Sequence, residues 1–218
     1  MMRFTAGLIA VAAWGLWLSP STAAAQGKFV IKPLAEKKVS QLPAGELYWR
    51  IESFSSGLYG SGVDENGNSV DDALAHAKAA AGNWSLVAEA AGRVWLFTLG
   101  PPGGSTMEGS KVAEVGPIPR VVAKHYLLRI NEASGPPGSI TKPHSHPGSE
   151  AFYVLTGESS SHTPAGVMRV AAGHSGNGNV ADTPMQVSSS GSTGLHSLVM
   201  FVVDADRPFS SPAKLHSP

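Results

Sequence analysis

The chain lacks cysteine altogether and carries few charged residues for its length. Without cysteine it can form neither a disulfide framework, nor a thiolate metal site, nor a cysteine nucleophile. Its 16 Lys and Arg residues balance its 16 Asp and Glu residues, and charged residues make up only 15% of the 218 positions. A chain with zero net charge and no block of like charge does not indicate a nucleic-acid-binding surface. Phosphate-loop, dinucleotide and serine-hydrolase motifs are also missing.

An apolar run near the start of the chain is typical of a secretory signal peptide. Arg3 precedes the run Leu8–Leu18, and Ala23–Ala25 place small residues directly before Gln26. A positive start, an apolar run and a small-residue cleavage site are the three parts of such a signal. The run is too short to span a bilayer. We therefore expect residues 1–25 to be removed and the protein to be secreted or periplasmic, without stable membrane insertion.

Glycine and proline are abundant, with 25 and 16 residues, and they divide the rest of the chain into short segments. Residues 70–81 predict a single helix, because Ser69 can cap it and Gly82 follows it as a stop. Other short segments rich in β-branched and aromatic residues predict strands, with turn signals between them, which favours a sandwich or small barrel. These predicted strands are 47–54, 85–90, 93–99, 111–115, 121–131, 139–145, 150–156, 166–171, 184–189 and 196–203.

Two histidines and one glutamate stand at a spacing that can bring them to one point. His144 and His146 share a face if their segment is extended, because side chains at i and i+2 of a strand project the same way. A Pro-Gly-Ser turn follows, and Glu150 then opens the next strand. Phe152 and Val154 have the parity of Glu150 and are expected to face inward, with the alternate residues facing outward. Two imidazoles and a carboxylate that converge make a metal site with open positions.

The segment from Gly138 to Gly157 resembles the first sequence signature of the cupin superfamily, G-x5-H-x-H-x3-E-x6-G, at every fixed position. The resemblance covers about residues 119–205. It implies a mainly β fold: the cupin double-stranded β-helix, or jelly-roll barrel, here with extra N-terminal strands and one short helix. It also implies that the two histidines and the glutamate bind a divalent metal (Fe, Mn, Ni, Zn or Cu) and that a small molecule binds in the barrel.

The resemblance divides the chain into four parts. We expect a signal peptide at 1–25, a strand-rich N-terminal extension with one helix at 26–118, the cupin barrel at 119–205, and a C-terminal tail at 206–218 that lies loosely on the surface. The glycine-rich residues 55–69 predict an exposed loop. Cupin-like barrels often pair through their sheet edges, so a homodimer is a further expectation.

The second cupin signature, G-x5-P-x-G-x2-H-x3-N, is altered in this chain. The best alignment places Met185 where the family has its histidine ligand. Met185 is therefore the predicted fourth contact to the metal, through its thioether sulfur. Gln186, His162, His174 and His196 are the alternatives, and His196 is the strongest of the three histidines because it opens a predicted core strand.

The residues leave three functions open. A two-histidine, one-carboxylate site suits dioxygenase chemistry with iron, and isomerase, lyase or hydrolytic chemistry with manganese, nickel or zinc. A methionine beside two histidines favours copper, which indicates a non-catalytic metal or small-molecule binding module. A purely structural cupin is the third function. The resemblance leans toward an enzyme without identifying a substrate or a catalytic residue.

Overall fold

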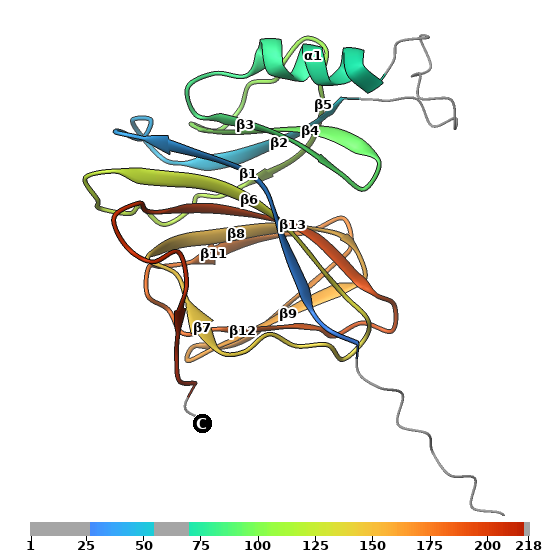
Figure 1. Cartoon of the computed structure of the whole chain (residues 1–218), viewed down its shortest axis with the longest axis vertical. Coiled ribbons are helices and arrows are strands. Elements are labelled where there is room, and N and C mark those ends of the chain that lie inside the picture. The colour runs from blue at the N-terminus through green and yellow to red at the C-terminus, as the bar shows by residue number, and fades with distance from the viewer. Residues whose placement is uncertain (1–26, 55–69, 216–218) are drawn as a thin grey trace, which may run out of the picture.

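The structure is a computed structural model, and it describes residues 27–54 and 70–215. The predicted signal peptide and the predicted loop at 55–69 lie outside the described residues. Four layers are stacked in the order helix, four-stranded sheet, five-stranded sheet and three-stranded sheet (Figure 1). Within the described ranges, no helix is both long enough and apolar enough to cross a membrane.

All the sheets are antiparallel, and their strands come from distant parts of the chain. The four-stranded sheet has the order β3-β4-β2-β5, the five-stranded sheet β1-β6-β13-β8-β11, and the three-stranded sheet β10-β9-β12, while β14 pairs with β7. The elements are β1 Val30–Val39, β2 Tyr48–Phe54, α1 Val70–Ala80, β3 Ser85–Ala90, β4 Arg93–Gly100, β5 Ser110–Val115, β6 Tyr126–Gly135, β7 His144–Ser145, β8 Gly148–Thr156, β9 Glu158–Thr163, β10 Gly166–Ala171, β11 Ser175–Asn179, β12 Gln186–Ser189, β13 Leu195–Asp204 and β14 Ser211–Pro212.

Helix α1 covers the outer face of the four-stranded sheet. Its Ala73 and Ala77 are buried against Phe54, Val94 and Leu96 of that sheet. Alanine has a short side chain, so the helix can approach the sheet closely, although each residue buries little apolar area. The helix therefore caps the molecule on the side away from the barrel, as Figure 1 shows.

The inner face of the four-stranded sheet packs against the five-stranded sheet. Trp49, Trp95 and Phe97 supply the largest side chains and are each at most 1% exposed. They belong to one cluster with Leu128 and Met200 of the five-stranded sheet, which we call the sandwich core. Burial of aromatic side chains of this size removes a large apolar area from water and is the main stabilising contribution here.

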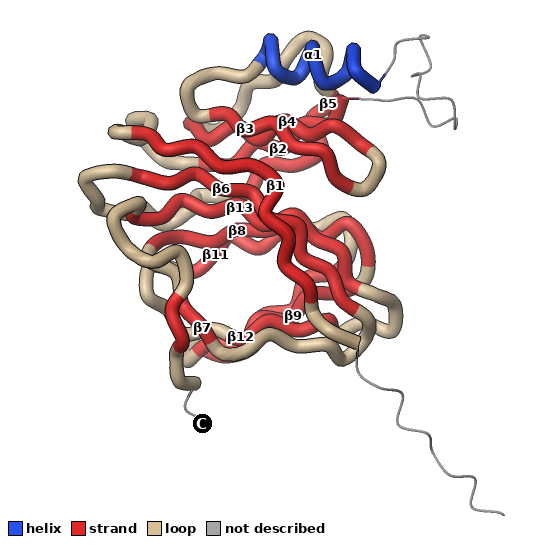
Figure 2. Tube along the Cα trace, in the orientation of Figure 1, coloured by secondary structure: helices blue, strands red, loops and turns tan. Residues whose placement is uncertain are grey.

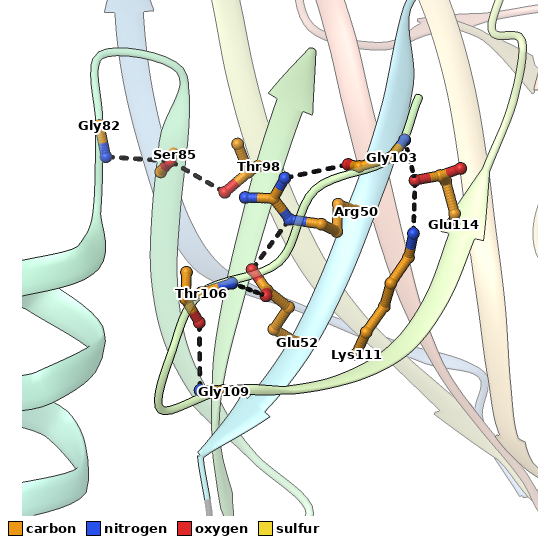
Figure 3. Close-up of polar contacts among 10 residues, drawn as sticks. All are labelled: Arg50, Glu52, Gly82, Ser85, Thr98, Gly103, Thr106, Gly109, Lys111 and Glu114. Carbon is orange, nitrogen blue, oxygen red and sulfur yellow. Dashed lines mark hydrogen bonds and ion pairs between the residues drawn. The ribbon is translucent and has the colours of Figure 1, made fainter. Parts of the chain in front are cut away.

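A polar cluster fixes the connection between β4 and β5 to the outer face of the four-stranded sheet (Figure 3). Glu52 is fully buried and forms an ion pair with Arg50, with Nε and Oε2 3.0 Å apart. The backbone N–H of Thr106 donates to Glu52 Oε1 at 2.6 Å, and Arg50 Nη1 donates to the carbonyl oxygen of Gly103 at 3.2 Å. The buried carboxylate is thus paired, as a charge in the interior must be.

The other face of the five-stranded sheet lines the barrel, and the three-stranded sheet closes it (Figure 2). Phe152 and Val154 lie in the apolar cluster inside the barrel, whereas Ala151 and Tyr153 contact the sandwich core. The alternation predicted for this strand is confirmed. Two facing antiparallel sheets in this order form the double-sheet barrel that the cupin resemblance implies, so the predicted mainly β cupin fold is confirmed.

The predicted helix and the predicted strands at 85–90 and 93–99, which pair as the β3–β4 hairpin, are confirmed within one residue at each end. Strands β1, β9 and β11 were not predicted, because they are rich in Lys, Ser, Gly or Asn and have low intrinsic β-propensity. β1 lies in the predicted extension, yet it pairs along β6 at the edge of the barrel sheet. Their pairing partners, rather than their composition, make these segments strands.

Two predicted strands differ from the observed strands by more than two residues at one end or both. The strand expected at 139–145 is wrong for most of its length, since only β7 is a strand and Ile140 forms an isolated bridge. The strand expected at 121–131 begins five residues later and continues to Gly135. Both segments border turns rich in proline, which supplies no backbone N–H to a sheet ladder.

Candidate metal centre

The structure brings the three predicted ligands together inside the barrel. One ligand atom from each of His144, His146 and Glu150 lies within 4.8 Å of the other two. His146 Nε2 and Glu150 Oε2 are 3.7 Å apart, which is less than twice a metal–ligand bond of ~2.1 Å. His144 sits at the short strand β7, and Glu150 comes from β8 after the turn. The predicted convergence of these side chains is therefore present in the fold.

Backbone carbonyl groups orient both imidazole rings. Nδ1 of His144 lies 2.8 Å from the carbonyl oxygen of Lys142, and Nδ1 of His146 lies 2.7 Å from that of Phe209. A carbonyl oxygen only accepts, so each Nδ1 carries the proton and donates it. In the neutral form of each ring the Nε2 lone pair is then free to bind a metal, which is the usual arrangement at histidine metal ligands.

Burial shifts the ionisation of two of the three candidate ligands. Removal from water raises the pKa of Glu150 to about 7. Burial also lowers the pKa of His146 to about 4, although its hydrogen bond to Phe209 opposes the shift. In both cases the neutral form is favoured, because a charge is poorly solvated in the barrel. The imidazole is therefore ready to bind a cation at neutral pH, while the carboxyl group must lose a proton.

The donor set fits a divalent cation. Glu150 Oε2 is buried, has no hydrogen-bond partner among the described residues, and lies 3.7 Å from Nε2 of His146. Two imidazole nitrogens and one carboxylate oxygen suit iron, manganese, nickel, zinc or copper. A bound ion would polarise a ligand oxygen as a Lewis acid. His144, His146 and Glu150 would hold the ion, and the carbonyl groups behind the rings would keep them oriented.

Met185 lies next to the candidate centre in the fold. Its backbone exchanges two hydrogen bonds with that of His144, at 2.8 and 2.9 Å, and its side chain is only 2% exposed. Its sulfur accepts a hydrogen bond from Asn179 Nδ2 at 3.7 Å. Asn179 lines the cavity and pairs with Glu150 across β11 and β8, whereas Met185 is not among the lining residues. Asn179 thus joins Met185 as a candidate fourth contact.

The alternative replacement ligands lie away from the triad. His196 forms an ion pair with Glu132, with Nε2 and Oε1 2.6 Å apart. His174 is exposed, with Nδ1 3.1 Å from the carbonyl oxygen of Ala172. Gln186 donates from Nε2 to the carbonyl oxygen of Thr141. These three and His162 are absent from the cavity lining.

The C-terminal segment was expected to lie loosely on the surface, and for Phe209 this is wrong. The Phe209 ring packs against the rings of His146 and Phe201, with centroids 4.8 and 4.9 Å apart, and the guanidinium of Arg129 lies 4.2 Å above it. Strand β14 pairs with β7, which carries His144. The only feature of the sequence that could have indicated this packing was one aromatic residue within a stretch rich in proline and serine. The segment supports both histidines from behind.

A cavity of about 320 Å³ lies beside the triad. Aromatic side chains, among them Phe152 and Phe201, and the hydroxyl groups of Ser159 and Ser161 contribute to its wall. This volume lies at the small end of the range for ligand sites, ~300–1,000 Å³. The three candidate ligands thus face a space that can hold a small molecule.

Comparisons with known proteins return structural neighbours only. No family model and no curated protein matches the chain. A cupin superfamily protein from Desulfitobacterium hafniense is 14% identical, with a TM-score of 0.32, over 35% of this chain and 68% of its own. A polyketide cyclase from Streptomyces resistomycificus is 21% identical, with a TM-score of 0.34, over 41% and 62%.

A DMSP lyase from Ruegeria pomeroyi is 19% identical, with a TM-score of 0.35, over 39% of this chain and 42% of its own. The chain spans 44% of the length of a second protein described as a DMSP lyase. Each of these matches covers less than half of this chain. No activity of these proteins is assigned to this chain on such similarities.

Proposed function

We propose that this cupin-fold protein is an exported metalloprotein that holds one divalent metal ion through His144, His146 and Glu150 and binds a small organic molecule beside it. The observation that carries the proposal is the convergence of three donors in the lining of one cavity, with a buried carboxylate oxygen that has no hydrogen-bond partner among the described residues. Met185 is the proposed fourth contact. Export and a homodimer paired through sheet edges belong to the same proposal.

The proposed activity is metal-assisted chemistry of the dioxygenase or isomerase type. Three protein ligands leave coordination positions open for a ligand oxygen or for dioxygen. His146 and Glu150 are buried in the barrel, where electrostatic interactions are stronger than in water. Glu150 neutralises one of the two positive charges of the metal, and the neutral imidazoles contribute none, so the centre attracts an anionic ligand.

Copper binding without catalysis is the second candidate. Met185, directly before β12, pairs through its backbone with the candidate ligand His144, and its side chain is buried. Thioether sulfur is a soft donor and favours copper over harder ions. In this function the cavity would shield the metal rather than bind a substrate.

Metal content and affinity test both candidates. The full chain, expressed with export to a periplasm, is expected to retain one divalent ion per molecule, measured by elemental analysis. The triple variant His144→Ala, His146→Ala, Glu150→Gln is expected to lose it, whereas His174→Ala, which changes an exposed histidine, keeps it. Equal retention by the triple variant would overturn the proposal.

A second comparison separates enzyme-type binding from copper binding. Affinities for Mn²⁺, Zn²⁺ and Cu²⁺ are measured in Met185→Ala and in the control Met168→Ala, whose methionine is partly exposed on β10. Tight copper binding that is lost only in Met185→Ala supports the copper module. Retention of all three affinities in Met185→Ala excludes the thioether as a ligand and leaves the three-residue site.

A further inference from the structure

Strand β9 forms a second polar wall of the cavity. Ser159 and Ser161 line the cavity, whereas Ser160 between them does not, as expected from the alternation of side chains along a strand. Ser161 is 3% exposed, and its Oγ is buried without a hydrogen-bond partner among the described residues. A buried hydroxyl group without a partner costs about 1–3 kcal/mol. Its partner is therefore expected in the contents of the cavity.

This hydroxyl group lies at a distance from the candidate metal centre. Ser161 pairs with Val187, whereas His144 forms its bridge with Met185, two residues earlier in the chain. The Ser161 backbone is thus two residues, about 7 Å, along the strands and two strand spacings, about 10 Å, across from that of His144. One small molecule can therefore contact the metal centre at one end and Ser161 at the other.

The charged and titratable side chains of the cavity lining come from residues 142–150, and none comes from β9, β10 or β12 around Ser161. Among the described residues that line it, the charged or titratable ones are Lys142, His144, His146 and Glu150. The wall around Ser161 has hydroxyl and apolar side chains. A charged ligand group at that end would be buried without a counter-ion, at a cost of several kcal/mol. The end near Ser161 therefore selects a neutral group.

A purely apolar ligand end is also disfavoured. A ligand that packs against Ser161 without a polar group leaves the Oγ unpartnered, whereas a ligand that hydrogen-bonds to the Oγ removes that cost. The cavity volume of about 320 Å³ lies at the small end of the range for ligand sites, ~300–1,000 Å³. The ligand is therefore small and has a neutral polar group at the end far from the metal.

We propose that the cavity binds a small monoanion whose charged oxygen faces the metal and whose distal hydroxyl or carbonyl group hydrogen-bonds to Ser161. The chemical class is the short ω-hydroxy or ω-oxo monocarboxylic acids, and dicarboxylates are excluded. The inference rests on the proposed metal site, because a divalent ion with one carboxylate and two neutral imidazoles leaves one net positive charge at the near end.

Binding of matched acids to the Co²⁺-loaded full chain tests the proposal. Calorimetry and the visible spectrum of Co²⁺ are followed with butyrate, 4-hydroxybutyrate and succinate, and with the ω-hydroxy acids one carbon shorter and longer. The best hydroxy acid is expected to bind about fivefold more tightly than its unsubstituted counterpart, the effect of one net hydrogen bond. Succinate is expected to bind at least tenfold more weakly than 4-hydroxybutyrate.

Two serine variants show which hydroxyl group is responsible for the preference for the hydroxy acid. Ser161→Ala is expected to remove the preference for the hydroxy acid while Co²⁺ affinity is unchanged. Ser160→Ala, which alters the neighbouring buried serine outside the cavity lining, is the matched control and keeps the preference. In both variants, binding of the acid is expected to change the visible spectrum of Co²⁺, because the acid still binds at the metal.

The outcomes separate this inference from the proposed function. Loss of Co²⁺ retention, or retention that is independent of the triad, overturns the metal site. Retention through the triad combined with equal or tighter binding of succinate, an unchanged preference in Ser161→Ala, or no binding of any acid at millimolar concentration overturns the inference alone.

Discussion

The two sides of the five-stranded sheet differ in how they are filled. On the outer side, the sandwich core is packed with large apolar side chains, including Trp49, Trp95 and Phe97, that are at most 1% exposed. On the inner side, the same strands border a cavity of about 320 Å³. Buried polar atoms without a partner among the described residues occur on both sides: Trp49 Nε1 in the sandwich core, and Glu150 Oε2 and Ser161 Oγ at the cavity. The outer face of the five-stranded sheet thus contributes stability through close packing, whereas its inner face is less closely packed and borders the candidate site.

The difference in packing between the two faces suggests a role for the four-stranded sheet outside the barrel. Buried polar groups without partners and an unfilled cavity lower the free energy of unfolding. Apolar burial against the outer sheet offsets this cost without filling the barrel. Stability and the candidate site are therefore assigned to opposite faces of the same strands, and substitutions on the two faces should have different effects.

The largest effect on the free energy of unfolding is expected from two matched substitutions of phenylalanine by alanine. Phe97→Ala in the sandwich core is expected to lower the free energy of unfolding by about 3–5 kcal/mol, because it empties a fully packed position. Phe152→Ala in the cavity wall is expected to cost about 1–2 kcal/mol, since its ring already lacks partner atoms on one side. Urea denaturation of the metal-free proteins measures both values. Equal losses would contradict the contrast between the two faces.

A substitution in the triad is expected to have a smaller effect on stability, and to raise it rather than lower it. Glu150→Gln is expected to raise the stability of the metal-free protein at pH 8 by about 1–3 kcal/mol while abolishing metal affinity. Burial raises the pKa of Glu150 from 4.5 to about 7. Between these pH values the unfolded chain has released the proton that the folded chain keeps, so the Glu150 contribution falls as pH rises and is constant above pH 7.

The pH series provides the check on this sign. The stability difference between Glu150→Gln and the parent is expected to be near zero at pH 4 and to grow up to pH 7 in thermal unfolding measurements. Glu89→Gln, which changes an exposed carboxylate on β3, serves as the control and should show no such trend. A difference that shrinks with rising pH would refute the role of burial.

A smaller effect on stability, with a clear effect on metal binding, is expected at Phe209. Phe209→Ala removes the ring that packs on His146. It also loosens the Phe209 carbonyl group, which accepts a hydrogen bond from His146 Nδ1. Partners behind a metal ligand are typically worth about 10–100-fold in affinity, and a loss near the lower value is expected here because the carbonyl group itself remains. Competition with a chromophoric chelator measures Zn²⁺ affinity. Phe29→Ala, another truncation of a cavity-lining ring, should leave it unchanged.

The smallest effect is expected at the start of the C-terminal segment. Arg207 forms two hydrogen bonds with the Asp182 carboxylate, at 2.7 and 3.0 Å, and this contact holds the pKa of Asp182 below its usual 3.8. Both side chains are about half exposed, so Arg207→Ala is expected to cost less than ~1 kcal/mol. Faster amide hydrogen exchange at 207–213, absent from the control Lys214→Ala, would show the loosened segment.

The sequence predicted the local part of the candidate site well. The spacing of His144, His146 and Glu150 lies within seven residues, so strand parity and one turn suffice to bring the three donors together. The helix at 70–80 and the β3–β4 hairpin were also predictable, because cap and turn residues act over a few positions. Met185 as a ligand stays a prediction, as does the division of the chain into extension, barrel and tail.

Contacts between distant segments could not be predicted in the same way. Strand β9 contains three consecutive serines, which no propensity marks as a strand, and it forms because β10 and β12 pair with it on either side. Phe209 follows His146 by 63 positions, and its carbonyl group orients that ring only after the C-terminal segment returns to β7. No spacing rule connects residues so far apart.

The amino-acid sequence by itself determined which residues can meet at the candidate metal centre, because side-chain direction within a strand follows from the backbone period. Only the tertiary structure decided what surrounds them: a sandwich core outside the sheet, a cavity inside it, the Phe209 carbonyl group behind His146 and the Ser161 hydroxyl group on the far wall. Burial and long-range pairing depend on where distant strands pack, and short-range periodicity contains no information about that.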